Sequence, residues 1–353
     1  MRILAINPGS TSTKIAVFED EQPILRTTIR HSATELARFN TVAEQYDFRK
    51  QLILEELDKE NIPLNFNVIM GRGGLLKPMS GGVFEVNELM REEIVHARRQ
   101  HACNLGGLIA SELASGIEGC RAYIADAGVT DELDEVARVT GCPLVPKITI
   151  FHALNQKAVA RKYAASIGRH YEDLNLVIAH LGGGISVGAH RKGRVVDVNN
   201  ALDGSGPFSP ERSGTMQAGE LVSLCFSGKY TQKEITSMIF GKGGLMAHFG
   251  TNDAKTLSDE AKAGNEQVKL VLDAMLYNVG KEIAAMSAAL YGKVDAILLT
   301  GGMAYDKEWM EAIEEQVAFL APVHVYPGED ELEALAMSGL RVLRGEEVVQ
   351  EYC

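Results

Sequence analysis

One repeated pattern constrains the fold of this chain more than any other feature. A short apolar run at residues 3–6 leads into the loop Asn-Pro-Gly-Ser-Thr-Ser-Thr-Lys at residues 7–14, and apolar residues then resume. In the second half, the run at 176–179 leads into His-Leu-Gly-Gly-Gly at 180–184, and residues 185–189 follow in the same way. Each unit is typical of two strands joined by a turn of small residues. The repetition predicts two related domains.

The length of the chain supports the same division. At 353 residues it exceeds what one hydrophobic core usually organises, so two domains are expected. Apolar strand-like runs alternate with amphipathic helical stretches, which is typical of an α/β fold with mixed sheets. A further strand is expected at 195–198, and buried strands at 67–70, 122–125, 296–299 and 323–326. Helices are expected at 47–60, 152–167 and 265–291, and hinges near 143–147 and 327–328.

The composition narrows the location and the class of partner. No apolar run approaches the roughly 20 residues that a membrane span needs, and the first apolar run ends too early for a secretory signal, so a cytoplasmic location is expected. The five cysteines are scattered, which argues against a disulfide framework or a zinc site and predicts reduced, mostly buried thiols. A net charge of −12 disfavours nucleic acid and anionic membranes, which leaves a small molecule.

Residues 7–14 form the first candidate phosphate-binding loop. The hydroxyls of Ser10 and Ser12, the amide of Asn7, the ammonium of Lys14 and the backbone N–H groups are donors suited to phosphate oxygens. The same composition is also typical of an ordinary hairpin turn, because these residue types favour turns for conformational reasons. The chain contains no Gly-x4-Gly-Lys-Ser/Thr sequence, so this loop is not a P-loop.

Glycine turns follow two expected strands of the second half. The Gly-Gly-Gly sequence at 182–184 would let a backbone approach an anion closely, although a bulge or a tight turn explains it equally well. With the loop at 7–14, it could clamp the phosphates of one nucleotide. The Gly-Gly sequence at 301–302 could carry adenosine at a strand end, or form a simple strand-to-helix turn.

Two arginines and one aspartate lie where substrate-binding residues commonly occur. Arg72 in Gly-Arg-Gly-Gly and Arg212 in Glu-Arg-Ser-Gly present a planar fork that suits carboxylates and phosphoryl groups, although a loop arginine is commonly a solvated surface charge. Asp126 directly follows the expected strand at 122–125, a usual place for a catalytic or metal-associated carboxylate. It could instead precede a helix at 131–138, for which Thr130 is the better N-cap.

Six segments spread over nearly the whole chain resemble the acetokinase family, and within it the butyrate kinase branch. They are the loop at 7–14, Phe-His-Ala-Leu-Asn-Gln at 151–156, His-Leu-Gly-Gly-Gly at 180–184, Arg-Ser-Gly at 212–214, Gly-Thr-Asn-Asp at 250–253 and Thr-Gly-Gly-Met at 300–303. The resemblance implies the superfamily of acetate and sugar kinases, heat-shock chaperones and actin. It implies an α/β fold with two duplicated actin-like, ribonuclease H-like domains, mixed β-sheets flanked by helices, and an active-site cleft between them.

The same resemblance implies the domain limits and the reaction. It places the N-terminal domain at 1–149 plus 331–353 and the C-terminal domain, with the adenosine site, at 150–330.

The resemblance also implies the reaction, which is reversible transfer of the γ-phosphoryl group of ATP to a short-chain fatty acid. Butyrate is the favoured acid, the products are an acyl phosphate and ADP, and Mg²⁺ is the cofactor. Acetate, propionate and branched-chain acids remain alternatives, and a sugar or polyol kinase or a non-catalytic actin-like ATPase are more distant ones. A homo-oligomer of two or more chains is also implied.

The resemblance assigns roles residue by residue. The implied catalytic residues are Arg72, Asp126, His152 and Arg212. The implied nucleotide- and phosphate-binding residues are Asn7, Ser10, Ser12, Lys14, His180, Gly182, Gly183, Gly184, Asp253, Gly301 and Gly302. Asn7, Asp126 and Glu331 are implied to hold Mg²⁺ through water. The chain departs from the family at Lys255, where acetokinases carry arginine, at Gly183, where acetate kinases carry asparagine, and around Asp131.

Overall fold

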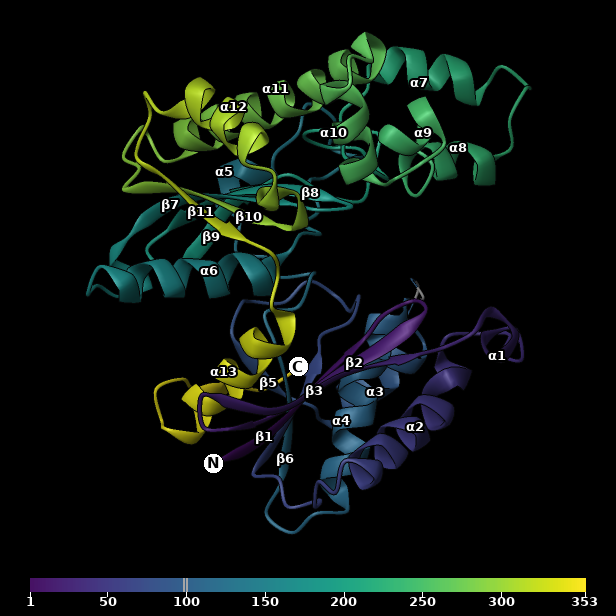
Figure 1. Ribbon diagram of the computed structural model, residues 1–353, viewed down its shortest axis with the longest axis vertical. Coiled ribbons are helices and arrows are strands. Elements are labelled where there is room, and N and C mark those ends of the chain that lie inside the picture. The colour runs from purple at the N-terminus through teal and green to yellow at the C-terminus, as the bar shows by residue number, and fades with distance from the viewer. Residues whose placement is uncertain (98, 100) are drawn as a thin grey trace. The chain divides into compact units, whose positions relative to one another are not determined.

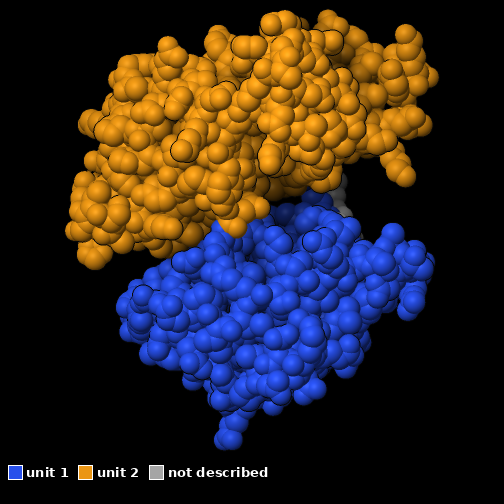
Figure 2. All heavy atoms as spheres, in the orientation of Figure 1, with its two compact units in different colours: residues 1–130, 330–353 blue, residues 131–329 orange. Residues whose placement is uncertain are grey.

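The computed structural model describes residues 1–97, 99 and 101–353, which form two compact units. Unit 1 comprises Met1–Thr130 and Asp330–Cys353, and unit 2 comprises Asp131–Glu329 (Figure 2). The sequence placed the first domain limit at residue 149, whereas residues 131–149 lie in unit 2. They are held there by contacts such as the packing of Leu133 against Phe151 and the ion pair of Glu132 with Lys157 at 2.7 Å.

Unit 1 is built on a seven-stranded mixed sheet with the order β12-β5-β6-β4-β1-β2-β3 (Figure 1). Its strands are β1 (Arg2–Pro8), β2 (Ser12–Glu19), β3 (Gln22–Arg30), β4 (Val68–Arg72), β5 (Val83–Glu85), β6 (Arg121–Ala125) and β12 (Val349–Gln350). Its α-helices are α1 (Ala33–Leu36), α2 (Tyr46–Lys59), α3 (Glu88–Val95), α4 (Leu105–Ser115) and α13 (Glu331–Leu343). Strands β1, β4 and β6 run parallel, so their carboxyl ends meet at one edge of the sheet.

Unit 2 is built on a five-stranded mixed sheet with the order β11-β10-β7-β8-β9. Its strands are β7 (Asn175–Leu181), β8 (Ile185–Arg191), β9 (Arg194–Val198), β10 (Ala296–Gly301) and β11 (Val323–Pro327). Its α-helices are α5 (Glu135–Arg138), α6 (Ala153–Ser166), α7 (Ala218–Cys225), α8 (Gln232–Ile239), α9 (Leu245–Phe249), α10 (Ala254–Lys262), α11 (Glu266–Ala289) and α12 (Lys307–Val317).

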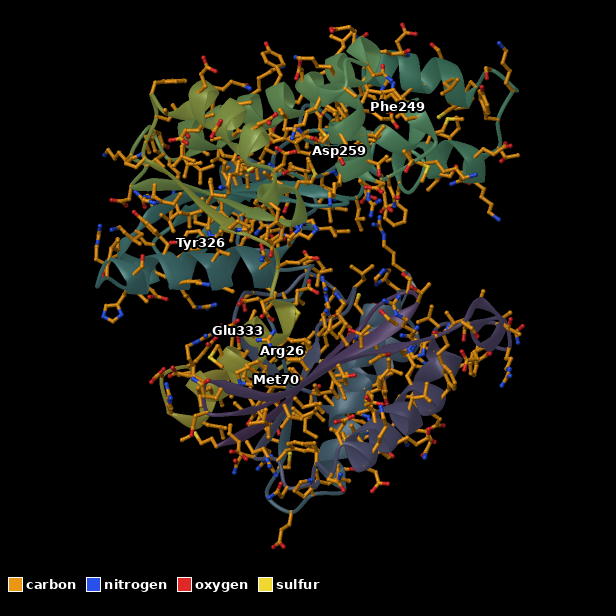
Figure 3. All side chains as sticks on the ribbon, viewed as in Figure 1. Arg26, Met70, Phe249, Asp259, Tyr326 and Glu333 are labelled. Atoms are coloured by element: carbon orange, nitrogen blue, oxygen red, sulfur yellow. The ribbon has the colours of Figure 1, made fainter. Side chains whose placement is uncertain are left out.

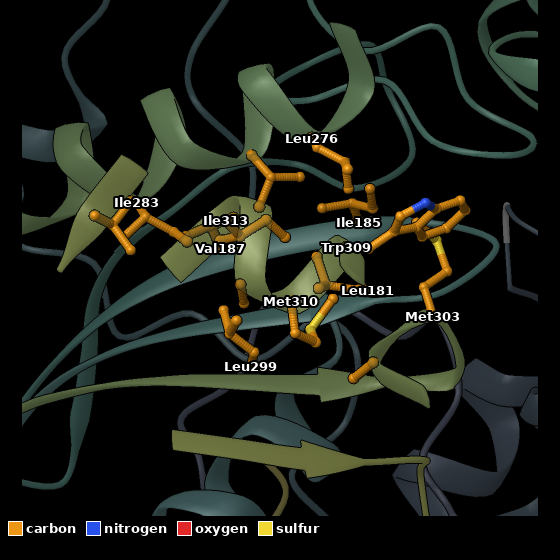
Figure 4. Packing of buried hydrophobic residues seen from close by; sticks show 14 of the residues in the cluster. Leu181, Ile185, Val187, Leu276, Ile283, Leu299, Met303, Trp309, Met310 and Ile313 are labelled. Atoms are coloured by element: carbon orange, nitrogen blue, oxygen red, sulfur yellow. The ribbon is translucent and has the colours of Figure 1, made fainter. Parts of the chain in front are cut away.

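Alternation along the strands of unit 2 gives the sheet two apolar faces, because successive side chains point to opposite sides. One face carries Val187 and Leu299 against Ile283 of α11 and Ile313 of α12 (Figure 4). The other face packs against α6 through a separate buried cluster that includes Val159, Tyr163, Leu176, Ile178 and Leu298. A sheet covered by helices on both sides leaves only strand ends and loops for a ligand.

The two units repeat one topology. In unit 1, β1 pairs antiparallel with β2 and parallel with β4, and β2 continues to β3. In unit 2, β7 pairs antiparallel with β8 and parallel with β10, and β8 continues to β9. Mixed sheets flanked by helices in two duplicated units confirm the predicted α/β class.

Three local expectations are wrong. The strand at 323–326 is not buried, because β11 lies at the sheet edge with a neighbour on one side only. The helix expected at 131–138 is only the single turn Glu135–Arg138, and the hydroxyl of Thr130 donates to the Ala127 carbonyl instead of capping it. The cysteines are not mostly buried: Cys103 is buried, Cys120 is half-buried, and Cys142, Cys225 and Cys353 are exposed.

Within the described residues, none of the helices combines the length and the apolar character that crossing a membrane requires.

Candidate active site

Three residues of unit 1 follow or end neighbouring parallel strands. The register pairs Ile6 of β1 with Gly71 of β4, and Gly71 with Ile124 of β6. Asn7 and Arg72 therefore stand side by side, and Asp126 comes directly after the end of β6. Carboxyl ends of adjacent parallel strands are a common place for ligand-binding side chains. The sheet thus gathers residues that are far apart in the sequence.

Glu331, the first residue of α13, joins this group. Its carboxylate accepts hydrogen bonds from Asn7 Nδ2 and Arg72 Nη1, and Arg72 Nη1 also lies 3.4 Å from Asn7 Oδ1. The Glu331 side chain is 13% exposed and that of Arg72 is 32% exposed. The ion pair fixes the guanidinium in one orientation while leaving part of it accessible. We call Asn7, Arg72 and Glu331 the Arg72 cluster.

The start of α13 is itself anchored. Asp330 is the N-cap residue, and its carboxylate accepts from the Glu333 N–H at 2.9 Å. Arg26 of β3 forms an ion pair with Asp330 and reaches Glu333 at 3.7 Å (Figure 3). These contacts hold the first turn of the helix, and hence Glu331, against the sheet.

Asp126 adopts a backbone conformation that is uncommon for residues other than glycine. Its φ of 39° lies in the left-handed region, and it is only 3% exposed. Its N–H donates to the Gly82 carbonyl at 3.0 Å, and its carboxylate accepts from the Gly82 N–H at 2.8 Å. Strained backbone of this kind costs about 1–3 kcal/mol and is concentrated at functional sites. The geometry is compatible with the predicted role of Asp126.

The loop at 7–14 is held by hydrogen bonds from Arg49, a residue that the sequence analysis missed. Arg49 lies on α2 with no exposed surface, and burial lowers its pKa to about 10. Its guanidinium donates to the carbonyls of Gly9, Ser10 and Ser12 at 2.8–3.2 Å. A buried cation therefore binds the carbonyl side of this loop, while Ser10 and Lys14 are exposed. The sequence signal was only an arginine on the apolar side of a predicted helix.

Replacing Arg49 with methionine is expected to lower the melting temperature and to raise the KM for ATP by about tenfold. The reason is that buried carbonyls lose their donors, at a cost of about 1–3 kcal/mol each, and the loop loses a positive charge beneath it. Thermal melting and initial rates at varied ATP measure the two effects. Arg49→Lys retains the charge without the fork, so it should recover part of the KM loss. An unchanged KM in Arg49→Met would contradict the assignment.

His152 and His180 lie together in unit 2. Their rings stack with centroids 3.8 Å apart and planes 12° apart. His180, at the end of β7, is 1% exposed, and its nitrogens contact Asn155 Oδ1 at 2.7 Å and Glu329 Oε2 at 3.2 Å. His152 is half-buried at the start of α6 and contacts Ser186 Oγ at 2.8 Å. His180 thus supports the ring of His152 and is itself enclosed.

Arg212 is a largely desolvated cation in unit 2. Its side chain is 15% exposed, lies over the Phe240 ring at 4.0 Å and contacts the Glu211 carboxylate at 3.2 Å. Its Nε is buried and has no hydrogen-bond partner in the described part of the chain. Burial lowers the pKa of Arg212 from its usual range, although Glu211 opposes the shift. An incompletely satisfied buried guanidinium is suited to an anionic ligand.

The Arg212 loop is tied to the glycine triplet. The carbonyl of Gly183 accepts from the Glu211 N–H at 3.2 Å and from Ser209 Oγ at 2.7 Å. A Cβ on Gly184 would lie 3.5 Å from Cε1 of His152. Within unit 2 the structure therefore brings together His152, His180 and the triplet at 182–184, and it ties the loop that carries Arg212 to the triplet.

A cavity of about 660 Å³ opens beside this group. It is lined by Gly182, Gly183, Pro210, Asn252, Ala254, Lys255, Ser258, Asp259, Lys262, Gly302, Met303, Tyr305, Asp306, Lys307, Glu308 and Trp309. The volume lies within the usual range for small-molecule sites, and the lining combines apolar, cationic and polar groups. Its position between the glycine triplet, α10 and the first turn of α12 makes it the candidate nucleotide site of unit 2.

Four of the nucleotide-binding residues predicted in unit 2, His180, Gly184, Asp253 and Gly301, do not line this cavity. Gly301 packs against β7, where a Cβ would lie 2.3 Å from the Leu181 carbonyl oxygen. Asp253 caps α10 by accepting from Thr256, and these hydrogen bonds lower its pKa. Lys255 does line the cavity, two residues further along.

Sequence reasoning missed the α12 side of the cavity. Asp306, the N-cap of α12, accepts from Ser258 at 2.7 Å and from Lys262 at 3.2 Å. Burial opposes the shift, but hydrogen bonds from Ser258, Trp309 and Lys262 hold the pKa of Asp306 below its usual range. The signal that could have found it was the Asp four residues after Gly302, directly before residues 307–317, whose apolar residues recur at helical spacing.

A family model described as the acetokinase family matches residues 149–321. "Probable butyrate kinase" from Bacteroides thetaiotaomicron is 54% identical over 352 residues, which is 100% of each chain. Butyrate kinase 1 from Clostridium acetobutylicum is 54% identical over 353 residues, covering 99% of each chain. Among solved structures, an acetate kinase from Porphyromonas gingivalis has a TM-score of 0.76 at 19% identity, covering 97% of this chain and 99% of that chain, which shows the shared fold. With full-length relatives at this level of identity, the chain belongs to the acetokinase family.

Proposed function

We propose that this protein is an ATP-dependent carboxylate kinase that transfers the γ-phosphoryl group of ATP reversibly to a short-chain fatty acid, giving an acyl phosphate and ADP. Butyrate is the favoured acid, because relatives matched over their full length at 54% identity carry that name. Membership of the acetokinase family supports the reaction class.

Arg212 is the observation that carries the proposal. Its guanidinium is buried, its Nε has no partner among the described residues, and its loop is hydrogen-bonded to the glycine triplet through Glu211 and Ser209. Such a group is suited to one that gains or shares negative charge. A carboxylate acceptor is already ionised at neutral pH, so no general base is needed. The chemistry instead requires charge neutralisation and alignment, which arginines and fixed donors supply.

Each group of residues then takes one role. Arg72, oriented by Glu331, binds the carboxylate of the acid. Arg212 and His152 stabilise the transferring phosphoryl group. The glycine triplet and Gly302 border the nucleotide together with Lys255, and the donors of Asn7, Ser10, Ser12 and Lys14 bind phosphate oxygens.

Mg²⁺ completes the proposal, and the residues present fit a hydrated ion. Asp126 and Glu331 provide hard carboxylate oxygens and Asn7 an amide oxygen, the donor types that Mg²⁺ prefers. Such an ion would be carried by the nucleotide phosphates and contacted by these side chains through water. When bound, Mg²⁺ neutralises phosphate charge.

The proposal also includes a cytoplasmic location, which the sequence implies, and a homo-oligomer of two or more chains, which the resemblance implies.

The test is hydroxylamine trapping of the acyl phosphate. The protein is incubated with Mg-ATP, hydroxylamine and either butyrate, propionate, isobutyrate or acetate, and hydroxamate formation is measured. We expect hydroxamate with at least butyrate, and kcat/KM across the four acids ranks their chain-length preference. ATP consumption without hydroxamate from any acid, together with phosphorylation of glycerol or a sugar, would reject the proposal in favour of a sugar or polyol kinase.

A further inference from the structure

A line of buried polar side chains lies behind His152 in unit 2. Gln156 of α6 and Ser186 and His190 of β8 have no exposed surface. Ser186 contacts His152, and Gln156 contacts both Ser186 and His190. An unpaired buried polar atom costs about 1–3 kcal/mol, so such groups complete their hydrogen bonds. The direction of each bond can therefore be deduced.

The main-chain carbonyl of Ser186 sets the direction. A carbonyl only accepts, so the Gln156 amide atom 3.0 Å from it is the NH₂ group. The other amide atom, Oε1, then faces Nε2 of His190 at 2.9 Å. Because Oε1 also only accepts, Nε2 of His190 carries the proton. Nδ1 of His190 accepts from the hydroxyl of Tyr171 at 2.7 Å.

The same orientation fixes the Ser186 hydroxyl. The Gln156 NH₂ group donates to Oγ at 2.9 Å, and the main-chain N–H of His152 points to it at 3.4 Å. With two donors directed at this oxygen, its hydrogen is directed to Nδ1 of His152 at 2.8 Å. In the neutral imidazole of His152, Nδ1 is therefore the acceptor and Nε2 carries the proton.

Two further contacts keep this geometry in place. A Cβ on Gly188 would lie 2.6 Å from Gln156 Oε1 and 3.1 Å from His190 Nε2, so the glycine leaves room for their hydrogen bond in the middle of β8. The stacked ring of His180 fixes the plane of the His152 ring. Nε2 of His152 lies beside the glycine triplet, 3.9 Å from where a Gly184 Cβ would be.

We propose that Ser186 and Gln156 are positioning residues that hold His152 as its Nε2–H tautomer, so that His152 offers a hydrogen-bond donor to the transferring phosphoryl group. The catalytic consequence rests on the proposed function, whereas the tautomer does not. A lone pair at Nε2 would repel a phosphoryl oxygen, and an N–H group stabilises it.

Long-range ¹H–¹⁵N correlation spectra of the histidine-labelled full chain, recorded at a pH where histidines are neutral, report the tautomer directly. Signals of His152 are identified by their loss in His152→Gln. The wild type is expected to show His152 protonated at Nε2. Ser186→Ala is expected to give mixed tautomers and about a tenfold lower kcat, with the KM for ATP changed less than about twofold.

Tyr171→Phe is the matched control, because it removes the hydroxyl that donates to Nδ1 of His190 without touching the bonds that set the Ser186 hydroxyl. It should retain the His152 tautomer and kcat even if its melting temperature falls. The proposal is overturned if wild-type His152 is protonated at Nδ1, if Ser186→Ala keeps the wild-type kcat, or if Tyr171→Phe lowers kcat equally. If the wild type shows the expected tautomer but makes no acyl phosphate, the proposed function fails and the positioning role stands.

Discussion

Replacing Arg212 with alanine is expected to lower kcat for acyl phosphate formation by about a thousandfold or more. An arginine that stabilises a transferring phosphoryl group is worth about 10³–10⁵ in rate. Arg212 is desolvated, and its Nε lacks a partner among the described residues, so its charge acts in surroundings of low dielectric constant. Coupled-assay rates at saturating ATP and butyrate measure the effect.

Two companion variants separate charge from geometry. Arg212→Lys keeps the charge without the planar fork, so it should recover only part of the lost rate. Arg169→Ala removes an arginine of the same unit whose side chain is 44% exposed, and it should leave kcat unchanged. A circular dichroism spectrum and a melting curve check that each variant is folded. A folded Arg212→Ala with kcat within about threefold of wild type would contradict the role of Arg212.

Replacing Gly301 with alanine is expected to destabilise unit 2 by about 2–6 kcal/mol. Gly301 has φ 96° and ψ 174°, a region essentially restricted to glycine, and a Cβ there would lie 2.3 Å from the Leu181 carbonyl oxygen. Backbone strain adds about 1–3 kcal/mol and overpacking a similar amount. Since domains are stable by only about 5–15 kcal/mol, melting and limited proteolysis should both report the loss.

Gly302→Ala is the matched comparison. Apart from its neighbours along the chain, the described residues place no atom within 4 Å of a Cβ built at Gly302, so the melting temperature of Gly302→Ala should stay close to that of wild type. Gly302 lines the candidate nucleotide cavity, and an added methyl group should raise the KM for ATP. Equal melting temperatures for the two variants would show that the close approach of β10 to β7 is not what requires Gly301.

Several features could be predicted from local sequence because they depend on local physics. The strands around residues 7–14 and 180–184 follow from apolar runs ended by turn residues, and both occur in the structure. The long helix α11 follows from its apolar periodicity. The exposure of β11 could not be predicted, because an apolar strand is buried or not according to its place in the sheet, which the segment does not encode.

In the loops at 7–14 and 301–302, too, the sequence identified some features and only the tertiary structure revealed the others. The sequence identified donors at 7–14, but not Arg49 beneath them, because the bonds from Arg49 to this loop join α2 to a turn about 40 residues earlier. Gly301 and Gly302 looked equivalent in sequence. Only their surroundings distinguish a glycine required by a neighbouring strand from one that borders a cavity.

The sequence by itself determined the α/β class, the duplication and the candidates Arg72, Asp126 and Arg212, since these depend on residue type, periodicity and spacing. His152 became a candidate through the family resemblance. The tertiary structure decided which residues act on one another. Glu331 pairs with Arg72 across 259 residues, and Ser186 contacts His152 across 34. Such contacts are set by strand order and helix packing, and hydrogen-bond direction at His152 is set by a buried carbonyl that no sequence pattern marks.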